Sequence, residues 1–136
     1  MNKNYKIWTP LKSEINNKNL RPQGCKKREI WICNLGENIG FEEDGKGNQF
    51  TRPVLILKVF NKNFCHIVPL STTNKRSRFY YPFNGQTGKI SVALLSQSRP
   101  IDIARLSRKV GYINKEKFEE IQTRIRKILF DCSLCH

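Results

Sequence analysis

The pattern of apolar and polar positions divides the chain into a polar leader, a strand-rich middle and a helix near the end. Residues 54–57 form an apolar run without polar interruption, which is typical of a strand buried on both faces. Pro53 is compatible with the first position of such a strand, where a missing N–H does little harm. Arg52 is therefore expected at the entrance to the core, as a permanent cation on rigid backbone.

Similar patterns predict the rest of a sheet. Runs rich in β-branched and aromatic residues predict strands at 29–35, 64–70, 79–83, 90–95 and 110–113. Pro82 makes the aromatic strand an expected sheet edge. Residues 61–63 predict a hairpin turn, and the glycine-rich residues 36–50 predict a long loop.

One clear helix follows the strands. Apolar residues at helical spacing predict it at 115–129, with Asn114 as its N-cap. Asp102 is expected to cap a short helical turn through Leu106. Several strands followed by a terminal helix predict a mainly β fold with α (α+β), a small, strongly bent antiparallel barrel with helical cover.

The chain is short enough for one main domain. Residues 1–28 are predicted to be a basic extension with a short helix and a linker. That helix is expected to begin at Thr9 and Pro10, as cap and first helical residue. Residues 29–130 are predicted to form the main domain, and residues 131–136 a tail.

Charge favours a polyanionic partner. The chain holds 25 Lys and Arg against 11 Asp and Glu, a net charge of +14. Residues 1–28 carry eight cations and one anion, and residues 29–113 carry twelve and six, so the middle is basic on its own account. No run has the length of a membrane span or a signal peptide, so we expect a cytoplasmic protein without a membrane partner.

The five cysteines predict free thiols rather than a disulfide framework. Cys33 and Cys65 lie in strand patterns and are expected to pack as small core residues. Residues 132–136 have the spacing of a haem attachment site, but the motif lacks an export signal and a pocket, and we interpret Cys132 and Cys135 as terminal thiols. A zinc site at Cys25 and His66 would need further ligands.

No cofactor or metal is expected. The carboxylates of residues 42–44 could hold a divalent ion, but adjacent carboxylates in a loop are usually solvated. In so basic a chain we expect them to pair with Arg52 or Lys46.

A further set of residues suits single-stranded nucleic acid. Arg52 begins one strand and Ser71 and Thr72 end its neighbour, followed by a run of cations and aromatic residues. Guanidinium, hydroxyl, cationic and stacking groups are the ones that bind single-stranded RNA. Residue types alone leave open whether such a site cuts RNA or only holds it.

Several short blocks resemble, in order, the motifs of the MazF/PemK-type toxins, the ribosome-independent mRNA interferases of toxin–antitoxin systems. The blocks are EIW at 29–31, GFEE at 40–43, TRPVLI at 51–56, VPLS at 68–71, SVALLSQSRPID at 91–102 and KVGYI at 109–113. The resemblance covers about residues 28–130. Arg28 stands where the family usually has glycine, Phe41 where some members have histidine, and Ser96 where some have an acidic residue.

The resemblance implies a compact barrel-like sheet and a homodimer that binds RNA across the dimer groove. It implies metal-independent cleavage, in which a ribose 2′-hydroxyl attacks its own phosphate to leave a 2′,3′-cyclic phosphate and a 5′-hydroxyl. It also implies an antitoxin partner, whose acidic tail would occupy the basic groove.

The family's catalytic arginine falls on Arg52 and its catalytic threonine on Ser71, with Thr72 adjacent as the alternative. Glu42 is a candidate to orient Arg52 and a weaker candidate for general base. The predicted RNA-binding residues are Lys46, Lys75, Arg76, Arg78, Tyr80 and Gln97.

Two other interpretations stay open at this point. One is a non-catalytic RNA- or protein-binding relative of the same fold; a CcdB-like gyrase poison is disfavoured, because the chain lacks that family's Trp-Gly-Ile ending. The other is a basic structural or ribosome-associated protein that uses residues 1–28 as a nucleic-acid arm.

Overall fold

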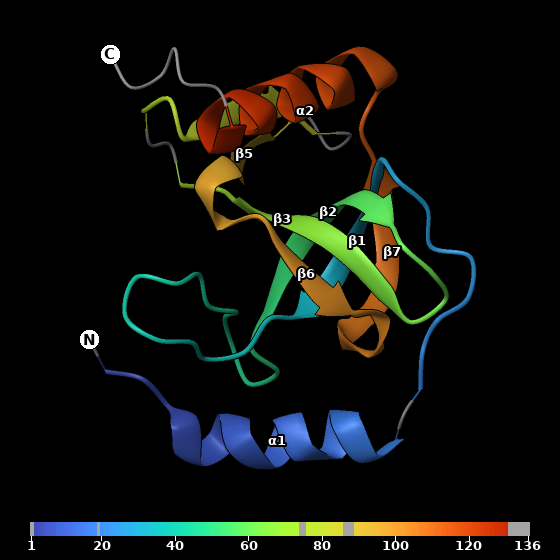
Figure 1. The fold of residues 1–136 in the computed structure, drawn as a ribbon. Coiled ribbons are helices and arrows are strands. Elements are labelled where there is room, and N and C mark those ends of the chain that lie inside the picture. Colours follow the sequence, from blue (N-terminus) through green and yellow to red (C-terminus); the bar gives the residue numbers. More distant parts are fainter. Residues whose placement is uncertain (1, 19, 74–75, 86–88, 131–136) are drawn as a thin grey trace.

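A strongly curved antiparallel sheet of seven strands lies between two helices (Figure 1). The computed structural model describes residues 2–18, 20–73, 76–85 and 89–130. The elements, with η for short 3₁₀ helices, are α1 (Tyr5–Lys18), β1 (Glu29–Asn34), β2 (Thr51–Val59), β3 (Phe64–Ser71), β4 (Tyr80–Asn84), β5 (Ile90–Leu94), η1 (Leu95–Gln97), β6 (Arg99–Asp102), η2 (Ile103–Arg105), β7 (Leu106–Tyr112) and α2 (Lys115–Phe130). The predicted α+β class with a bent, barrel-like sheet is confirmed.

Strand order explains the curvature. The strands follow the order β4-β5-β3-β2-β1-β7, and β6 pairs with β3 off this path. β3 therefore has three neighbours, because its first half pairs with β6 and its last two residues pair with β5. Register shifts between β1 and β7 and between β2 and β3 add bends of the kind that β-bulges produce. The proline-containing β4 lies at the edge, as predicted, whereas the short β6 was not predicted.

The central strand β2 is buried on both faces, as its apolar run predicted. Val54, Leu55 and Ile56 have no exposed surface. Val54 and Ile56 pack into one cluster with Cys33 and Cys65. Leu55 faces the other way, into a second cluster that includes residues of α2. The two faces of one strand thus serve two cores.

Cys33 and Cys65 pack as predicted. Both are fully buried and free, and burial raises the pKa of each thiol to about 12. They therefore behave as small apolar residues. Residues 132–136, with Cys132 and Cys135, lie outside the described residues. In the described part of the chain, no three His, Cys, Asp or Glu side chains are grouped closely enough to hold a metal ion.

Both predicted caps are present. Asn114 Oδ1 accepts a hydrogen bond of 2.8 Å from the backbone N–H of Lys117 and begins α2. Asp102 accepts from the N–H of Ala104 at 2.8 Å and begins η2. Neither α1 nor α2 has the length and apolarity that crossing a membrane requires.

The first helix begins earlier than predicted. It starts at Tyr5 rather than after Thr9, so Pro10 lies inside it. Pro10 removes one helical hydrogen bond, but Trp8, two residues earlier, is only 3% exposed, and its ring centroid lies 5.5 Å from that of Phe50. This tertiary packing stabilises the first turn, and no local signal in the sequence reports it.

The contacts of Arg28 explain how an arginine can stand where the MazF/PemK motif usually has glycine. Its φ is 77°, in the left-handed region that glycine adopts without cost. Its backbone N–H bonds to Ile56 and its guanidinium donates to the carbonyl of Ile113 at 3.1 Å. These contacts hold an arginine in a conformation that suits the family's glycine.

Candidate active site

Strand register brings Arg52 and Ser71 together. Val54 on β2 pairs with Pro69 on β3, and two residues further along that antiparallel register Arg52 stands opposite Ser71. Both side chains line one pocket of about 420 Å³. The full lining is Phe41, Glu43, Lys46, Arg52, Ser71, Thr73, Tyr80, Leu94, Ser96 and Gln97.

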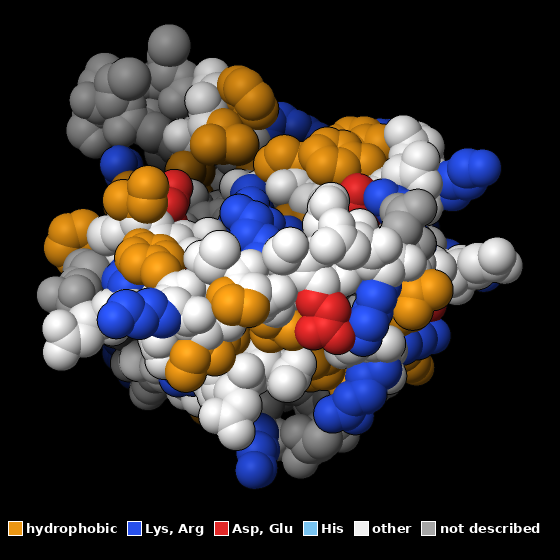
Figure 2. Space-filling model, turned by 90° about the horizontal axis from the view of Figure 1, so that it is seen from below, with side chains coloured by type: hydrophobic (Ala, Val, Ile, Leu, Met, Phe, Trp, Pro, Cys, Tyr) orange, Lys and Arg blue, Asp and Glu red, His pale blue; other side chains and the backbone are white. Residues whose placement is uncertain are grey.

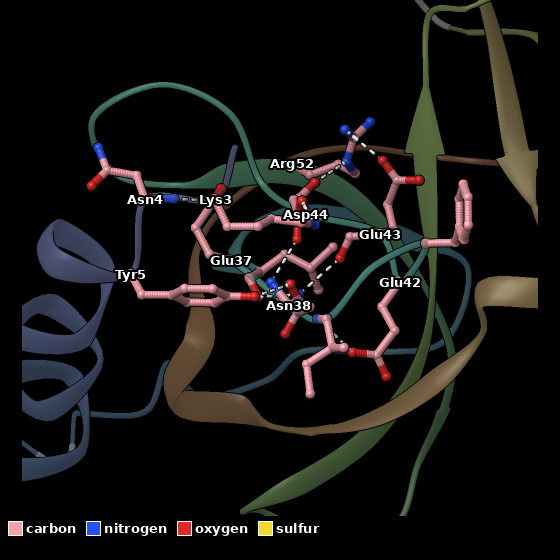
Figure 3. Close-up of polar contacts among 12 residues, drawn as sticks. Lys3, Asn4, Tyr5, Glu37, Asn38, Glu42, Glu43, Asp44 and Arg52 are labelled. Atoms are coloured by element: carbon pink, nitrogen blue, oxygen red, sulfur yellow. Dashed lines mark hydrogen bonds and ion pairs between the residues drawn. The ribbon is translucent and has the colours of Figure 1, made fainter. Parts of the chain in front are cut away.

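Arg52 is a buried cation held by three contacts, and it is 7% exposed. Its Nε donates to the carbonyl of Asp44 at 2.7 Å, and one terminal nitrogen donates to the carbonyl of Leu70 at 3.2 Å. The other terminal nitrogen pairs with the carboxylate of Glu43 at 2.7 Å (Figure 3). A guanidinium has five N–H groups, so three bonds orient it and leave two for a ligand.

The carboxylate that orients Arg52 comes from Glu43. The sequence prediction placed Glu42 in this role, and the structure corrects it. Glu42 is exposed, and its carboxylate accepts from the N–H of Ile39 at 2.8 Å within the loop. That bond closes a turn and turns Glu42 away from Arg52, so the neighbouring Glu43 reaches the guanidinium instead.

The loop of residues 36–50 is held in place by Asn38. Its backbone N–H donates to the side chain of Asp44 at 2.6 Å. Its side-chain amide donates to the carbonyls of Leu35 and Glu43, at 3.2 and 2.8 Å. Asn38 was not predicted from the sequence, although an asparagine in a glycine-rich loop is a common source of such side-chain-to-backbone bonds.

Gln97 holds the same loop from η1. Its side-chain oxygen accepts from the N–H of Glu43 at 3.1 Å, and its side-chain nitrogen donates to the carbonyl of Phe41 at 3.0 Å. The sequence predicted that Gln97 binds RNA. The structure places it in the pocket lining but directs both of its amide atoms to the protein.

The two candidate hydroxyl residues lie in different surroundings. Ser71 Oγ accepts a hydrogen bond of 3.1 Å from the N–H of Thr73, which fixes the Ser71 side chain. Thr72 is exposed and lines a smaller adjoining hollow of about 200 Å³, together with Lys46, Arg52 and Ser71. Ser71 borders both hollows.

The predicted RNA-binding residues are divided between the pocket and its surroundings. Lys46 and Tyr80 line the pocket. Arg76 and Arg78 are exposed on the connection between β3 and β4, and the guanidinium of Arg78 stacks over Phe79 at 4.9 Å. Lys75 lies outside the described residues.

Family membership follows from sequence comparison. The profile of the family described as "PemK-like, MazF-like toxin of type II toxin-antitoxin system" matches residues 26–129. The chain belongs to this family. In this PemK/MazF-family chain, Arg52, Ser71 and Glu43 all lie within the matched region, whereas α1 lies outside it. No curated protein gives a significant sequence match.

Solved structures agree with the PemK/MazF assignment at the level of the fold. The Mycobacterium tuberculosis toxin MazF-mt6 is 22% identical, with a TM-score of 0.56, over 74% of this chain and 94% of that one. MazF from Deinococcus radiodurans is 16% identical, with a TM-score of 0.62, over 82% and 98%. An endoribonuclease in complex with its cognate antitoxin from a mycobacterial species is 13% identical, with a TM-score of 0.59, over 78% and 95%.

Proposed function

We propose that this toxin-family chain is an endoribonuclease that cuts single-stranded RNA at the Arg52–Ser71 pocket. The observation that carries the proposal is the buried guanidinium of Arg52, oriented by Glu43 and two backbone carbonyls with N–H groups to spare. A fixed cation beside a hydroxyl, in a pocket open to solvent, suits the binding of a phosphodiester.

The proposed reaction is an internal transesterification. The ribose 2′-oxygen attacks the adjacent phosphorus and loses its proton, the bond from phosphorus to the 5′-oxygen breaks, and the 5′-oxygen gains a proton. Negative charge builds up on the phosphate in the transition state, where a preorganised guanidinium is most effective. Arg52 supplies the compensating positive charge, and the Ser71 hydroxyl donates a hydrogen bond to a phosphate oxygen. No step in this scheme uses a metal ion.

The surroundings of the pocket suit the RNA chain on either side of the cut. Lys46 at the rim, and Arg76 and Arg78 on the exposed connection between β3 and β4, would contact neighbouring phosphates. Tyr80 offers a ring on which an unpaired base can stack.

We further propose an acidic antitoxin as inhibitor and a homodimer as the working form. The structure of the mycobacterial endoribonuclease with its cognate antitoxin supports the first expectation. A peptide rich in Asp and Glu should compete with RNA for this basic pocket. Sedimentation of the purified protein tests the dimer.

Cleavage of single-stranded RNA in the presence of EDTA is the deciding experiment. We expect products with 2′,3′-cyclic phosphate ends, and a rate about 10²–10³-fold lower for Arg52→Ala. Arg108→Ala, which removes an exposed arginine from β7, is the matched control and should cut normally. If the wild-type protein binds RNA without cutting it, the protein is a binding module. If Arg52→Ala cuts RNA as well as wild type, the catalytic site does not include Arg52.

A further inference from the structure

The N-terminal segment contacts the loop that holds Arg52. Residues 2–18 lie before the region matched by the family profile. They nevertheless lie directly against the loop of residues 36–50, on the side of the sheet opposite α2 (Figure 1).

Three consecutive residues at the start of the segment each bind a different loop residue (Figure 3). The contacts are an ion pair between Lys3 and the carboxylate of Asp44, a hydrogen bond of 2.7 Å from the N–H of Asn4 to Glu37, and one of 2.6 Å from the hydroxyl of Tyr5 to the carbonyl of Asn38. The hydrogen bond to Asp44 raises the pKa of Lys3 above its ordinary value. The lysine side chain is 12% exposed, so this is not a freely solvated surface pair.

Trp8 adds an apolar anchor one turn further on. It is 3% exposed and packs against Phe50 at the end of the loop. Gly36, at the start of the loop, lies so close that a Cβ there would stand 2.2 Å from the indole. Trp8 therefore contacts both ends of the loop.

The chain just after the segment is also attached to the curved sheet. Arg21 makes two hydrogen bonds of 2.8 Å to the carboxylate of Asp102, the residue that caps η2. Because both ends are attached, α1 cannot swing away without breaking contacts at the loop or at η2.

Asp44 connects this segment to the active site. Its side chain binds Lys3 and the N–H of Asn38, while its backbone carbonyl accepts from Nε of Arg52 at 2.7 Å. The next residue towards the N-terminus, Glu43, pairs with the same guanidinium. A shift of Asp44 therefore moves two of the three groups that orient Arg52.

We propose that the N-terminal segment is a positioning element for Arg52, which acts through Asp44 and the loop of residues 36–50. The inference rests on the proposed function of Arg52, but the contacts themselves can be tested without RNA. It differs from a nucleic-acid arm, in which the lysines of α1 would bind phosphates and the loop would not depend on them.

Lys3→Ala removes the ion pair without touching the core. Lys6→Ala, the matched control, removes an exposed lysine from the first turn of α1. Hydrogen exchange of the peptide that covers residues 36–50 is the first readout. We expect faster exchange in Lys3→Ala and in Trp8→Phe, and wild-type exchange in Lys6→Ala. Lys3→Arg, which keeps the positive charge, should also exchange at the wild-type rate. This measurement keeps its meaning even if the protein cuts no RNA.

Cleavage kinetics give the second readout. Because a small displacement of a catalytic group can reduce turnover strongly, we expect kcat of Lys3→Ala to fall about tenfold with little change in KM. Unchanged loop exchange in both Lys3→Ala and Trp8→Phe overturns the proposal. Equal increases of KM in Lys3→Ala and Lys6→Ala also overturn it, because they would show a nucleic-acid arm.

Discussion

Arg52 acquires its role from the groups around it. A buried guanidinium without partners would carry a desolvation cost of several kcal/mol, and here two carbonyls and Glu43 meet it. No buried side-chain nitrogen or oxygen in the described part of the chain lacks a hydrogen-bond partner. The Arg52 guanidinium is thus stabilised and oriented in the free protein, as the proposed phosphate binding requires.

The two hydroxyl residues can be separated by substitution. We expect Ser71→Ala to reduce kcat about 10²-fold through the loss of one directed donor, and Thr72→Ala to stay close to wild type. Ser71→Thr, which installs the residue that the family resemblance places there, should keep activity. A larger loss in Thr72→Ala than in Ser71→Ala would assign the catalytic hydroxyl to Thr72.

His66 is expected to make stability depend on pH. It is half-buried on β3, away from the pocket, and burial lowers its pKa below the ordinary value of 6.5. The unfolded chain therefore binds the proton more readily, so the free energy of unfolding should fall as pH drops below about 6.5. The fall should stop once the pH is below the folded-state pKa. Urea unfolding of wild type and His66→Gln from pH 7.5 to 5.5 tests this, with a flatter profile expected for the variant.

At the scale of elements, the loop of residues 36–50 joins the parts of the site. Its glycines and acidic residues predicted an irregular segment, but its shape comes from Asn38 within it, Gln97 on η1 and Trp8 on α1. Each of these contacts spans a different sequence separation. Together with the Glu42–Ile39 turn, they set the direction of the loop in which Glu43 reaches Arg52.

Two glycines of the loop offer a matched pair of substitutions. Gly36 and Gly40 both have positive φ, at 85° and 53°, but only Gly36 faces Trp8. Gly40→Ala should cost about 1 kcal/mol for the left-handed conformation. Gly36→Ala should cost about 1–3 kcal/mol more, because its methyl group meets the indole. Equal losses in thermal or urea unfolding would argue against tight seating of Trp8.

At the scale of the whole molecule, the positive charge is distributed rather than confined to the pocket. Seen from the side of α1, most of the charged side chains on the surface are Lys and Arg (Figure 2). Such a field would attract RNA to the α1 face as well as to the pocket. The pocket itself contributes only Lys46 and Arg52, so affinity and cleavage should depend on different residues.

Salt dependence tests this division. For a 2′-O-methyl RNA that cannot be cut, contacts to about four phosphates predict a slope of about −3 in a plot of log K against log salt. Arg76→Ala and Arg78→Ala should each reduce the slope by about 0.7 while leaving kcat unchanged. An affinity that does not vary with salt would contradict phosphate binding by these residues.

The sequence by itself determined most of the elements and several of their buried and capping residues. The apolar run at 54–57 predicted the doubly buried β2, Asn114 and Asp102 predicted their caps, and Cys33 and Cys65 were predicted as core residues. These features depend on neighbours along the chain or on burial alone, and both leave periodic or local signals.

Only the tertiary structure decided the rest. The start of α1, the pairing of β6 with β3 and the choice of Glu43 over Glu42 depend on contacts between residues far apart in sequence. Which of two adjacent carboxylates meets an arginine depends on the direction in which a loop turns. That direction is a property of the packed molecule, and no spacing of residues along the chain encodes it.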